Sequence, residues 1–123
     1  MDISRIKQVL GDINDKVKGL DSMLLITEDG FPIASTLDTG DKEIRSTAAG
    51  AILCDAGLRG IKELDLGDLE AVVTLGTKGY FVLNRIKDAA ILVAVASRDV
   101  ALGMVLLRIK KALPEIIEAV EDA

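Results

Sequence analysis

The 123-residue chain contains no histidine and no tryptophan, and its single cysteine is Cys54. Without histidine, the chain cannot form a Ser-His-Asp triad, a His-ligated zinc site or an imidazole that exchanges protons near neutral pH. One cysteine cannot form an internal disulfide or a thiolate cluster, a usage typical of a reducing compartment. Several common kinds of enzyme chemistry are therefore excluded before any motif is considered.

Aromatic residues are also scarce. The chain has only Phe31, Tyr80 and Phe81, although half of its residues are hydrophobic. The core must therefore consist mainly of aliphatic side chains. This apolar fraction lies at the upper end of the usual range for a chain of this size, which raises the question of whether some apolar residues face a partner.

The charge balance and the short apolar runs exclude further classes. The chain has 15 basic and 20 acidic residues, a net charge of −5 that repels phosphate backbones, and too few aromatics to stack bases. Its longest apolar run, residues 89–96, falls short of the roughly 20 residues that span a bilayer. The first five residues lack the features of a signal peptide. We therefore expect a cytoplasmic protein that neither binds nucleic acid nor inserts into a membrane.

The hydrophobic periodicity predicts eight elements. Apolar residues at steps of three and four predict helices over residues 3–17, 42–64 and 99–120. Short apolar runs bounded by turn residues predict strands over 23–27, 31–35, 71–75, 80–86 and 89–96. Pro32 favours a sheet edge for the second strand, and the wholly apolar last strand favours the centre. The order predicts one α+β domain over residues 1–123, with helices covering both faces of a five-stranded, mainly antiparallel sheet.

The middle helix has two contrasting sides. Its predicted core stripe consists of Leu53, Cys54, Gly57, Leu58, Ile61 and Leu64. Because a helical glycine costs about 1 kcal/mol relative to alanine, Gly50, Gly57 and Gly60 predict close packing against a neighbouring element. On the charged side, an apolar line runs at steps of four through Ile44, Ala48 and Ile52. These three residues are either harmlessly exposed or part of a contact with another helix.

The last helix carries three further expectations. Ser97 or Asp99 is the expected N-cap, and Pro114 is expected to kink the helix or to mark a junction between two pieces. Because Val100, Met104 and Leu107 lie off the main apolar stripe, we expect the first turns to be buried on two sides.

Short motifs that suggest catalysis or ligand binding have simpler interpretations. Gly76-Thr77-Lys78-Gly79 has neither the spacing of a phosphate-binding loop nor the two flanking helices of a KH clamp, so it predicts a hairpin turn. Cys54 lies on the core side of its helix with no histidine to activate it, and it predicts a structural thiol.

Acidic residues give no stronger signal. Asp12, Asn14 and Lys16 resemble the start of a calcium loop, but a lysine stands at the third ligand position and the segment is helical by periodicity. Turn and cap roles account for Glu28, Asp29, Asp38 and Asp41. We therefore predict no catalytic residues, no cofactor site and no metal site.

Three segments together resemble the Roadblock/dynein-light-chain family. They are the hairpin Leu-Ile-Thr-Glu-Asp-Gly-Phe-Pro-Ile-Ala at residues 25–34, the Gly-flanked turn before residues 80–83, and residues 101–108 at the start of the last helix. The resemblance covers nearly the whole chain. Within the family, the chain is similar to single-domain prokaryotic members that regulate small GTPases. The resemblance implies a profilin-like or longin-like fold and a homodimer, or a heterodimer within the family, in which edge strands pair and the second helices lie side by side.

The resemblance also implies residue assignments. The dimer interface would consist of Ile44, Ala48, Ile52, Ala71, Val72, Val73, Thr74 and Leu75. A Ras-like small GTPase would contact Arg45, Ile52, Asp55 and Arg59, and the module itself would be non-catalytic. Two alternatives stay open: a small-molecule-binding sensor or adaptor domain with a PAS-like or profilin-like sheet, and an enzyme that uses acidic residues and a divalent metal.

Overall fold

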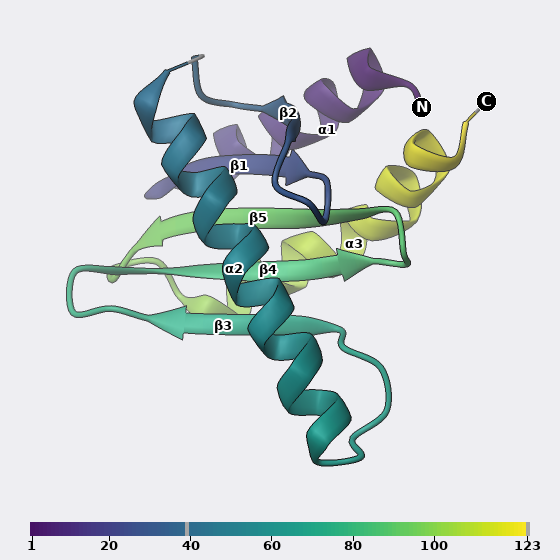
Figure 1. Cartoon of the computed structure of the whole chain (residues 1–123). Helices are drawn as coiled ribbons and strands as arrows, with labels where there is room; N and C mark the ends of the chain where they lie inside the picture. Colours follow the sequence, from purple (N-terminus) through teal and green to yellow (C-terminus); the bar gives the residue numbers. More distant parts are fainter. Residues whose placement is uncertain (39, 123) are drawn as a thin grey trace.

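The computed structural model describes residues 1–38 and 40–122. Helices and strands follow one another in the order that periodicity predicts (Figure 1). The elements are α1 (Ile3–Lys16), β1 (Leu20–Ile26), β2 (Pro32–Ser35), α2 (Asp41–Glu63), β3 (Ala71–Leu75), β4 (Gly79–Ile86), β5 (Ala90–Ser97) and α3 (Leu102–Glu121).

All five strands form one antiparallel sheet in the order β2-β1-β5-β4-β3. The predicted positions of two strands are confirmed: β5, which is almost wholly buried, lies at the centre, and β2, which contains Pro32, lies at an edge. The tetrapeptide at residues 76–79 joins β3 to β4 as a tight hairpin, in which the N–H of Gly76 donates to the carbonyl of Gly79. The fold class is therefore α+β, as predicted.

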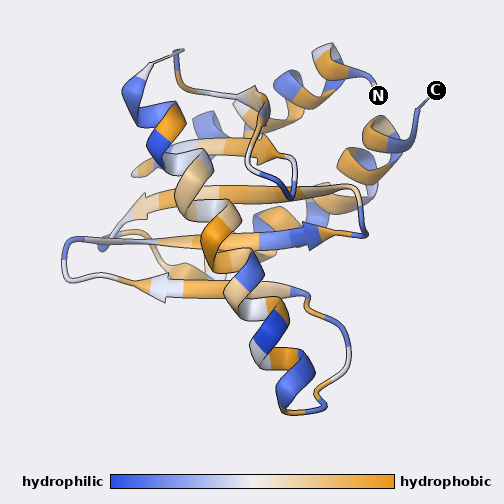
Figure 2. Ribbon diagram, in the orientation of Figure 1, coloured by the Kyte–Doolittle hydropathy of each residue, from blue (hydrophilic) through white to orange (hydrophobic). Residues whose placement is uncertain are grey.

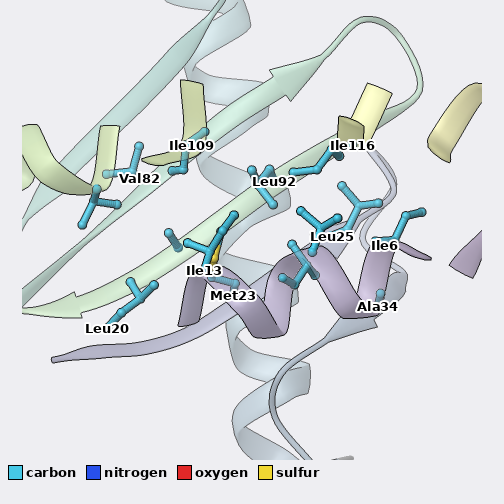
Figure 3. Close-up of a cluster of buried hydrophobic side chains, with 14 of the residues drawn as sticks. Ile6, Ile13, Leu20, Met23, Leu25, Ala34, Val82, Leu92, Ile109 and Ile116 are labelled. Atoms are coloured by element: carbon cyan, nitrogen blue, oxygen red, sulfur yellow. The ribbon is translucent and has the colours of Figure 1, made fainter. Parts of the chain in front are cut away.

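Helices cover both faces of the sheet, as Figure 1 shows. One face carries α1 and α3, and Figure 3 shows the aliphatic side chains that fill this layer, among them Ile13, Leu92 and Ile109. The other face carries α2, which packs on a smaller cluster around Leu24 and Cys54. As the scarcity of aromatic residues predicts, both core layers consist mainly of aliphatic side chains.

The start of α3 differs from expectation. Its N-cap is Ala101, which makes no side-chain cap bond, because Ser97 is the last residue of β5 and its carbonyl accepts the N–H of Val100 in the following turn. Val100 is buried, but the side chains of Met104 and Leu107 are half exposed, so the first turns are not buried on two sides. The helix continues through Pro114 rather than dividing into two pieces.

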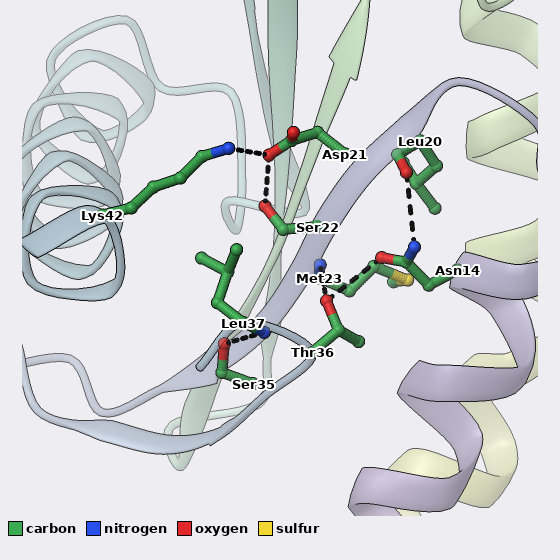
Figure 4. A network of polar contacts seen from close by, with 9 residues as sticks. All are labelled: Asn14, Leu20, Asp21, Ser22, Met23, Ser35, Thr36, Leu37 and Lys42. Atoms are coloured by element: carbon green, nitrogen blue, oxygen red, sulfur yellow. Dashed lines mark hydrogen bonds and ion pairs between the residues drawn. The ribbon is translucent and has the colours of Figure 1, made fainter. Parts of the chain in front are cut away.

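A polar network fixes the β2 side of the sheet (Figure 4). The hydroxyl of Thr36 donates to the side-chain oxygen of Asn14 and accepts the N–H of Met23. The Asn14 amide in turn donates to the carbonyl of Leu20. The network ties α1 to β1 and to the end of β2, so this edge of the sheet is held within the chain.

Candidate functional site

The two edges of the sheet differ in how readily another strand could add to them. Strand β2 has four residues, begins with Pro32, and its pairing with β1 shifts register at Leu25 and Ile26. Strand β3 pairs with β4 in an unbroken register and contains no proline. Short, irregular or proline-bearing edges resist pairing, whereas regular ones invite it. The β3 edge is therefore the one open to a partner strand.

Hydrogen bonds at both ends of β3 identify its free peptide groups. The N–H of Arg85 donates to the carbonyl of Glu70, and the N–H of Gly76 donates to the carbonyl of Gly79. Hydrogen-bonded pairs alternate along an antiparallel ladder, so the even-numbered residues between them also point at β4. The peptide groups that face the free edge are consequently those of Ala71, Val73 and Leu75.

The side chains of β3 divide between the two faces. Val72 packs with the cluster beneath α2. Val73 and Leu75 point to the opposite face, where 41% and 61% of their surfaces are exposed. The edge is therefore apolar on the face that carries α1 and α3, although neither helix covers it.

Helix α2 crosses all five strands and continues past the β3 edge (Figure 1). A Cβ on Gly50 would lie 2.9 Å from side-chain atoms of both Ile26 and Val93, and one on Gly57 would lie 2.8 Å from Val72, so these glycines allow close contact with β1, β5 and β3. Beyond Gly57 the helix runs for about 9 Å at 1.5 Å per residue, roughly two strand spacings. We call residues 58–66 the α2 extension; Leu58 and Ile61 within it still pack against the cluster beneath α2, whereas Leu64 and Leu66 are exposed.

The α2 extension explains one failed expectation. Leu64 continues the predicted stripe of core-facing positions, yet 69% of its surface is exposed, and Leu66 just after the helix is 62% exposed. The stripe has passed the last strand, so no core lies beneath Leu64. Gly60 likewise has no neighbour within 4 Å, in contrast to Gly50 and Gly57. Periodicity identified the correct side of the helix but could not show where the sheet ends.

The outward side of α2 mixes apolar and charged residues (Figure 2). Ile44 and Ile52 are each 67% exposed, and Ala48 between them is exposed as well. The predicted partner residues lie on the same surface: Arg45 pairs with Asp41 at 2.9 Å, and Arg59 pairs with Asp55 at 3.2 Å. Exposed pairs such as these contribute little to stability. Their charges therefore remain available to a partner.

One polar cluster was not predicted from the sequence. Arg85, at the end of β4, donates to Glu28 at 2.8 Å and to Asp88 at 2.9 Å, and its side chain is only 19% exposed. The bond to Glu28 raises the pKa of the Arg85 guanidinium further above its ordinary value. The only signal in the sequence is a charged residue inside an apolar strand. Arg85 also lines a hollow of about 510 Å³ beside Leu58 and Lys62 of the α2 extension.

Within residues 1–38 and 40–122, the thiol and the carboxylates considered for catalysis form no site: the thiol is buried, and the carboxylates do not cluster. Burial raises the pKa of the Cys54 thiol, so it stays protonated at neutral pH. Across the described residues, Asp, Glu and Cys form no group of three that could hold a metal ion. Within the same residues, no helix is both long and apolar enough to cross a membrane. The distinctive features of the surface are the β3 edge, the α2 extension and the outward side of α2.

Comparison with known proteins agrees with this geometry. The model of the Roadblock/LC7 domain matches residues 7–96. The chain therefore belongs to the Roadblock/LC7 family. A search of curated proteins found no match to its sequence.

Solved structures share the fold. MglB of Myxococcus xanthus has a TM-score of 0.87 at 21% identity, with all of both chains covered. A structure described as MglB with tetrameric arrangement has a TM-score of 0.87 at 22% identity, covering 98% of this chain and 91% of the other. Profilin II of Acanthamoeba castellanii has a TM-score of 0.64 at 16% identity, covering 93% and 94%. The fold is thus that of the Roadblock domains and is related to profilin.

Proposed function

We propose that the chain is a non-catalytic, homodimeric Roadblock module that binds and regulates a Ras-like small GTPase. The observation that carries the dimer is the free, apolar β3 edge beside a helix that extends past it. The family resemblance supports a small GTPase as the partner, and the mixture of apolar and charged residues on α2 supports the choice of contact residues.

The backbone pattern of β3 selects one dimer register. With a two-fold axis at Val73, Val73 pairs with its own copy, and Ala71 pairs with Leu75 of the other chain. All free peptide groups of the strand are then used. An axis at Val72 or Thr74 would engage only two of the three outward-facing residues. Val72 and Thr74 contribute through their side chains on the face of α2.

The same axis brings the two copies of α2 together through their C-terminal halves. Gly57 lies over Val72, so α2 passes on one side of the axis and the partner's helix passes on the other, next to Leu53. The α2 extension then covers the partner's sheet, which buries Leu64. Ile44 and Ala48, which the family resemblance assigns to the dimer interface, precede Gly50, which lies over β1 and β5. In the proposed register they lie outside the contact between the two copies, so the proposed dimer departs from that prediction.

The outward side of α2 is then the proposed GTPase contact, with Arg45, Ile52, Asp55 and Arg59. Ile44 and Ala48 extend the same surface as an apolar line. Each chain of the dimer presents one such surface. An apolar line bordered by polar and charged residues matches the usual anatomy of a protein–protein interface.

The test is a pull-down from the source organism with the full chain as bait, followed by a GTP hydrolysis assay on any small GTPase recovered. We expect a small GTPase whose binding depends on its nucleotide. Combined replacement of Ile52→Ser and Arg59→Ala should weaken it at least tenfold, because the change removes an apolar anchor and a charge. Lys18→Ala, an exposed change in the turn after α1, is the matched control and should have no effect.

Two outcomes would contradict this proposal. One is unchanged GTPase binding by the Ile52/Arg59 variant. The other is recovery of a tightly bound metabolite in place of any GTPase, which would favour the sensor hypothesis. A change in the hydrolysis rate upon addition of the chain would distinguish activation from inhibition.

A further inference from the structure

On the face of the sheet that carries α1 and α3, two helices are too few to cover all five strands. A helix packed on a sheet covers about two strands, because helices pack 8–10 Å apart and strands are about 4.8 Å apart. Here α1 contacts β1 and β2, while Val105 and Ile109 of α3 belong to the same hydrophobic cluster as Val82 of β4 and Leu92 of β5. Four strands are therefore covered, and the side chains of Val73 and Leu75 on β3 remain partly exposed.

Pairing of two β3 strands would double this exposed surface. It would form a floor of six apolar residues, Ala71, Val73 and Leu75 from each copy, between the two α3 helices. The floor would be two strands wide, about 10 Å, which matches the diameter of one helix with its side chains. We call this surface the seam trough; it rests on the proposed dimer.

One wall of the seam trough is already visible in the single chain. A hollow of about 430 Å³ lies between α3 and the start of β3, and its lining includes Leu106, Lys110 and Leu113 of α3. Lys110 is exposed and makes no ion pair with any residue in the described ranges. Two-fold symmetry about Val73 would place a second Lys110 on the opposite wall, at the other end of the floor.

The hollow also contains an unsatisfied polar atom. The side-chain oxygen of Asn84 is buried and has no hydrogen-bond partner among the described residues. The charged residues in this lining are Glu70, at the end of the floor, and the two basic residues Arg85 and Lys110, so the hollow carries a net positive charge. Each end of the trough thus has one Lys110 on one wall near Glu70, and the apolar floor lies between the two ends.

We propose that the seam trough binds one amphipathic helix of a partner protein, with acidic residues on both sides of its apolar stripe. The apolar stripe lies on the β3 floor, and the flanking carboxylates pair with the two Lys110 side chains. Because the trough lies on the two-fold axis, one helix serves two chains. This surface is on the opposite face of the sheet from α2, so a GTPase and the helix bind at the same time.

The probe is a fluorescein-labelled peptide of about 18 residues, long enough for a stable helix, with leucines at i, i+3, i+4 and i+7 and glutamates beside them. Sedimentation first establishes that the full chain is a dimer. We expect saturation at one peptide for two chains. A peptide with the same composition in shuffled order, and one with lysine for glutamate, should bind at least tenfold more weakly.

Two variants test the floor and the walls. Val73→Thr keeps the shape and strand preference of the residue while making the floor polar, and it should weaken peptide binding at least fivefold with the dimer intact. Lys110→Glu should weaken binding about tenfold, because repulsion replaces attraction on both walls. Lys111→Glu makes the same charge change on a different side of α3 and should change binding less than twofold.

Failure of this inference and failure of the proposed function are distinguishable. A monomer in sedimentation would contradict the dimer itself. A dimer that does not bind the peptide, binds two peptides, or binds it equally well in both variants would overturn the seam trough as a helix site. A tetramer that Val73→Thr dissociates would also overturn it, since a second dimer would then occupy the floor.

Discussion

At the scale of single residues, the glycines of the chain have different roles that follow from their surroundings. Gly50 lies against Ile26 and Val93, so a Cβ at this position would displace branched side chains in a closed cluster. Gly11, in the middle of α1, has nothing within 4 Å of the same point. The sequence shows both as helical glycines but cannot distinguish them, because the difference depends on the strands underneath.

This contrast gives a paired prediction. Gly50→Ala should lower the free energy of unfolding by about 1–3 kcal/mol, the usual range for an overpacked core. Gly11→Ala should raise it by up to about 1 kcal/mol, because alanine favours the helix and meets no neighbour. Urea denaturation of both variants checks the pair, and equal destabilisation would contradict the packing described.

Burial of Cys54 and Tyr80 makes stability depend on alkaline pH. Burial raises the pKa of the thiol and of the phenol above their ordinary values, about 8.5 and 10. For a group with a raised pKa in the folded state, the stabilisation is complete below the unfolded pKa. It is lost as the pH rises through the folded value, because the unfolded chain releases its proton first.

We therefore expect the free energy of unfolding to fall between pH 8 and pH 11. The double variant Cys54→Ala/Tyr80→Phe should show a shallower decline, since other titrating groups are shared by both proteins. Tyr80→Phe alone should also lose about 1 kcal/mol at neutral pH, because its hydroxyl donates to the carbonyl of Val100 at 2.8 Å. Parallel pH profiles for the parent and the double variant would contradict these assignments.

At the scale of elements, β3 is the strand whose tolerance of proline is most informative. The N–H of Val73 points to the free edge, so Val73→Pro removes no hydrogen bond within the chain. Thr74→Pro removes a bond to β4. We predict a folded monomer for Val73→Pro and a destabilised or unfolded chain for Thr74→Pro.

Circular dichroism and sedimentation measure the two effects separately. Retention of the dimer by Val73→Pro would mean that β3 does not pair with its own copy. Similar unfolding of both variants would instead contradict the alternation of hydrogen bonds along β3.

Periodicity predicts element existence well here because each element has one buried side and clear turn residues around it. It fails at the start of α3, where Ser97 and Asp99 have suitable cap chemistry but Ser97 ends β5. It fails again at Leu64, which lies on the correct side of α2 beyond the last strand. In both cases the local signal is sound, and the position of a distant strand determines the outcome.

At the scale of the whole molecule, the chain exposes more surface than a compact monomer should. Its accessible surface is 7268 Å², compared with roughly 6,400 Å² expected for this mass. The exposed large hydrophobic residues include pairs on α2, on the α2 extension and on β3. The many apolar residues thus lie in two places: in an aliphatic core, and on surfaces that the single chain leaves exposed.

The sequence alone could indicate the apolar line on α2 and the edge strand, but it could not assign them to different contacts. That distinction depends on how α2 crosses the sheet. Gly50 and Gly57 fix the crossing, so Ile44 lies far from the β3 edge while Leu53 and Gly60 lie next to the partner's helix in the proposed dimer. The lysine of the seam trough, Lys110, carries no motif and becomes notable only beside an uncovered strand.

The most direct test of the account is disulfide cross-linking of the full chain in solution. Each single cysteine is introduced into a Cys54→Ala background, so that no other thiol is present. With the two-fold axis at Val73, the Cα atoms of the two residues 73 lie about 5.5 Å apart, within reach of a disulfide, whereas two residues 74 lie beyond it. We predict rapid cross-linking of Val73→Cys under mild oxidation and little or none of Thr74→Cys. Efficient cross-linking at Thr74 but not at Val73, or at neither position, would contradict the dimer on which the proposed function is built.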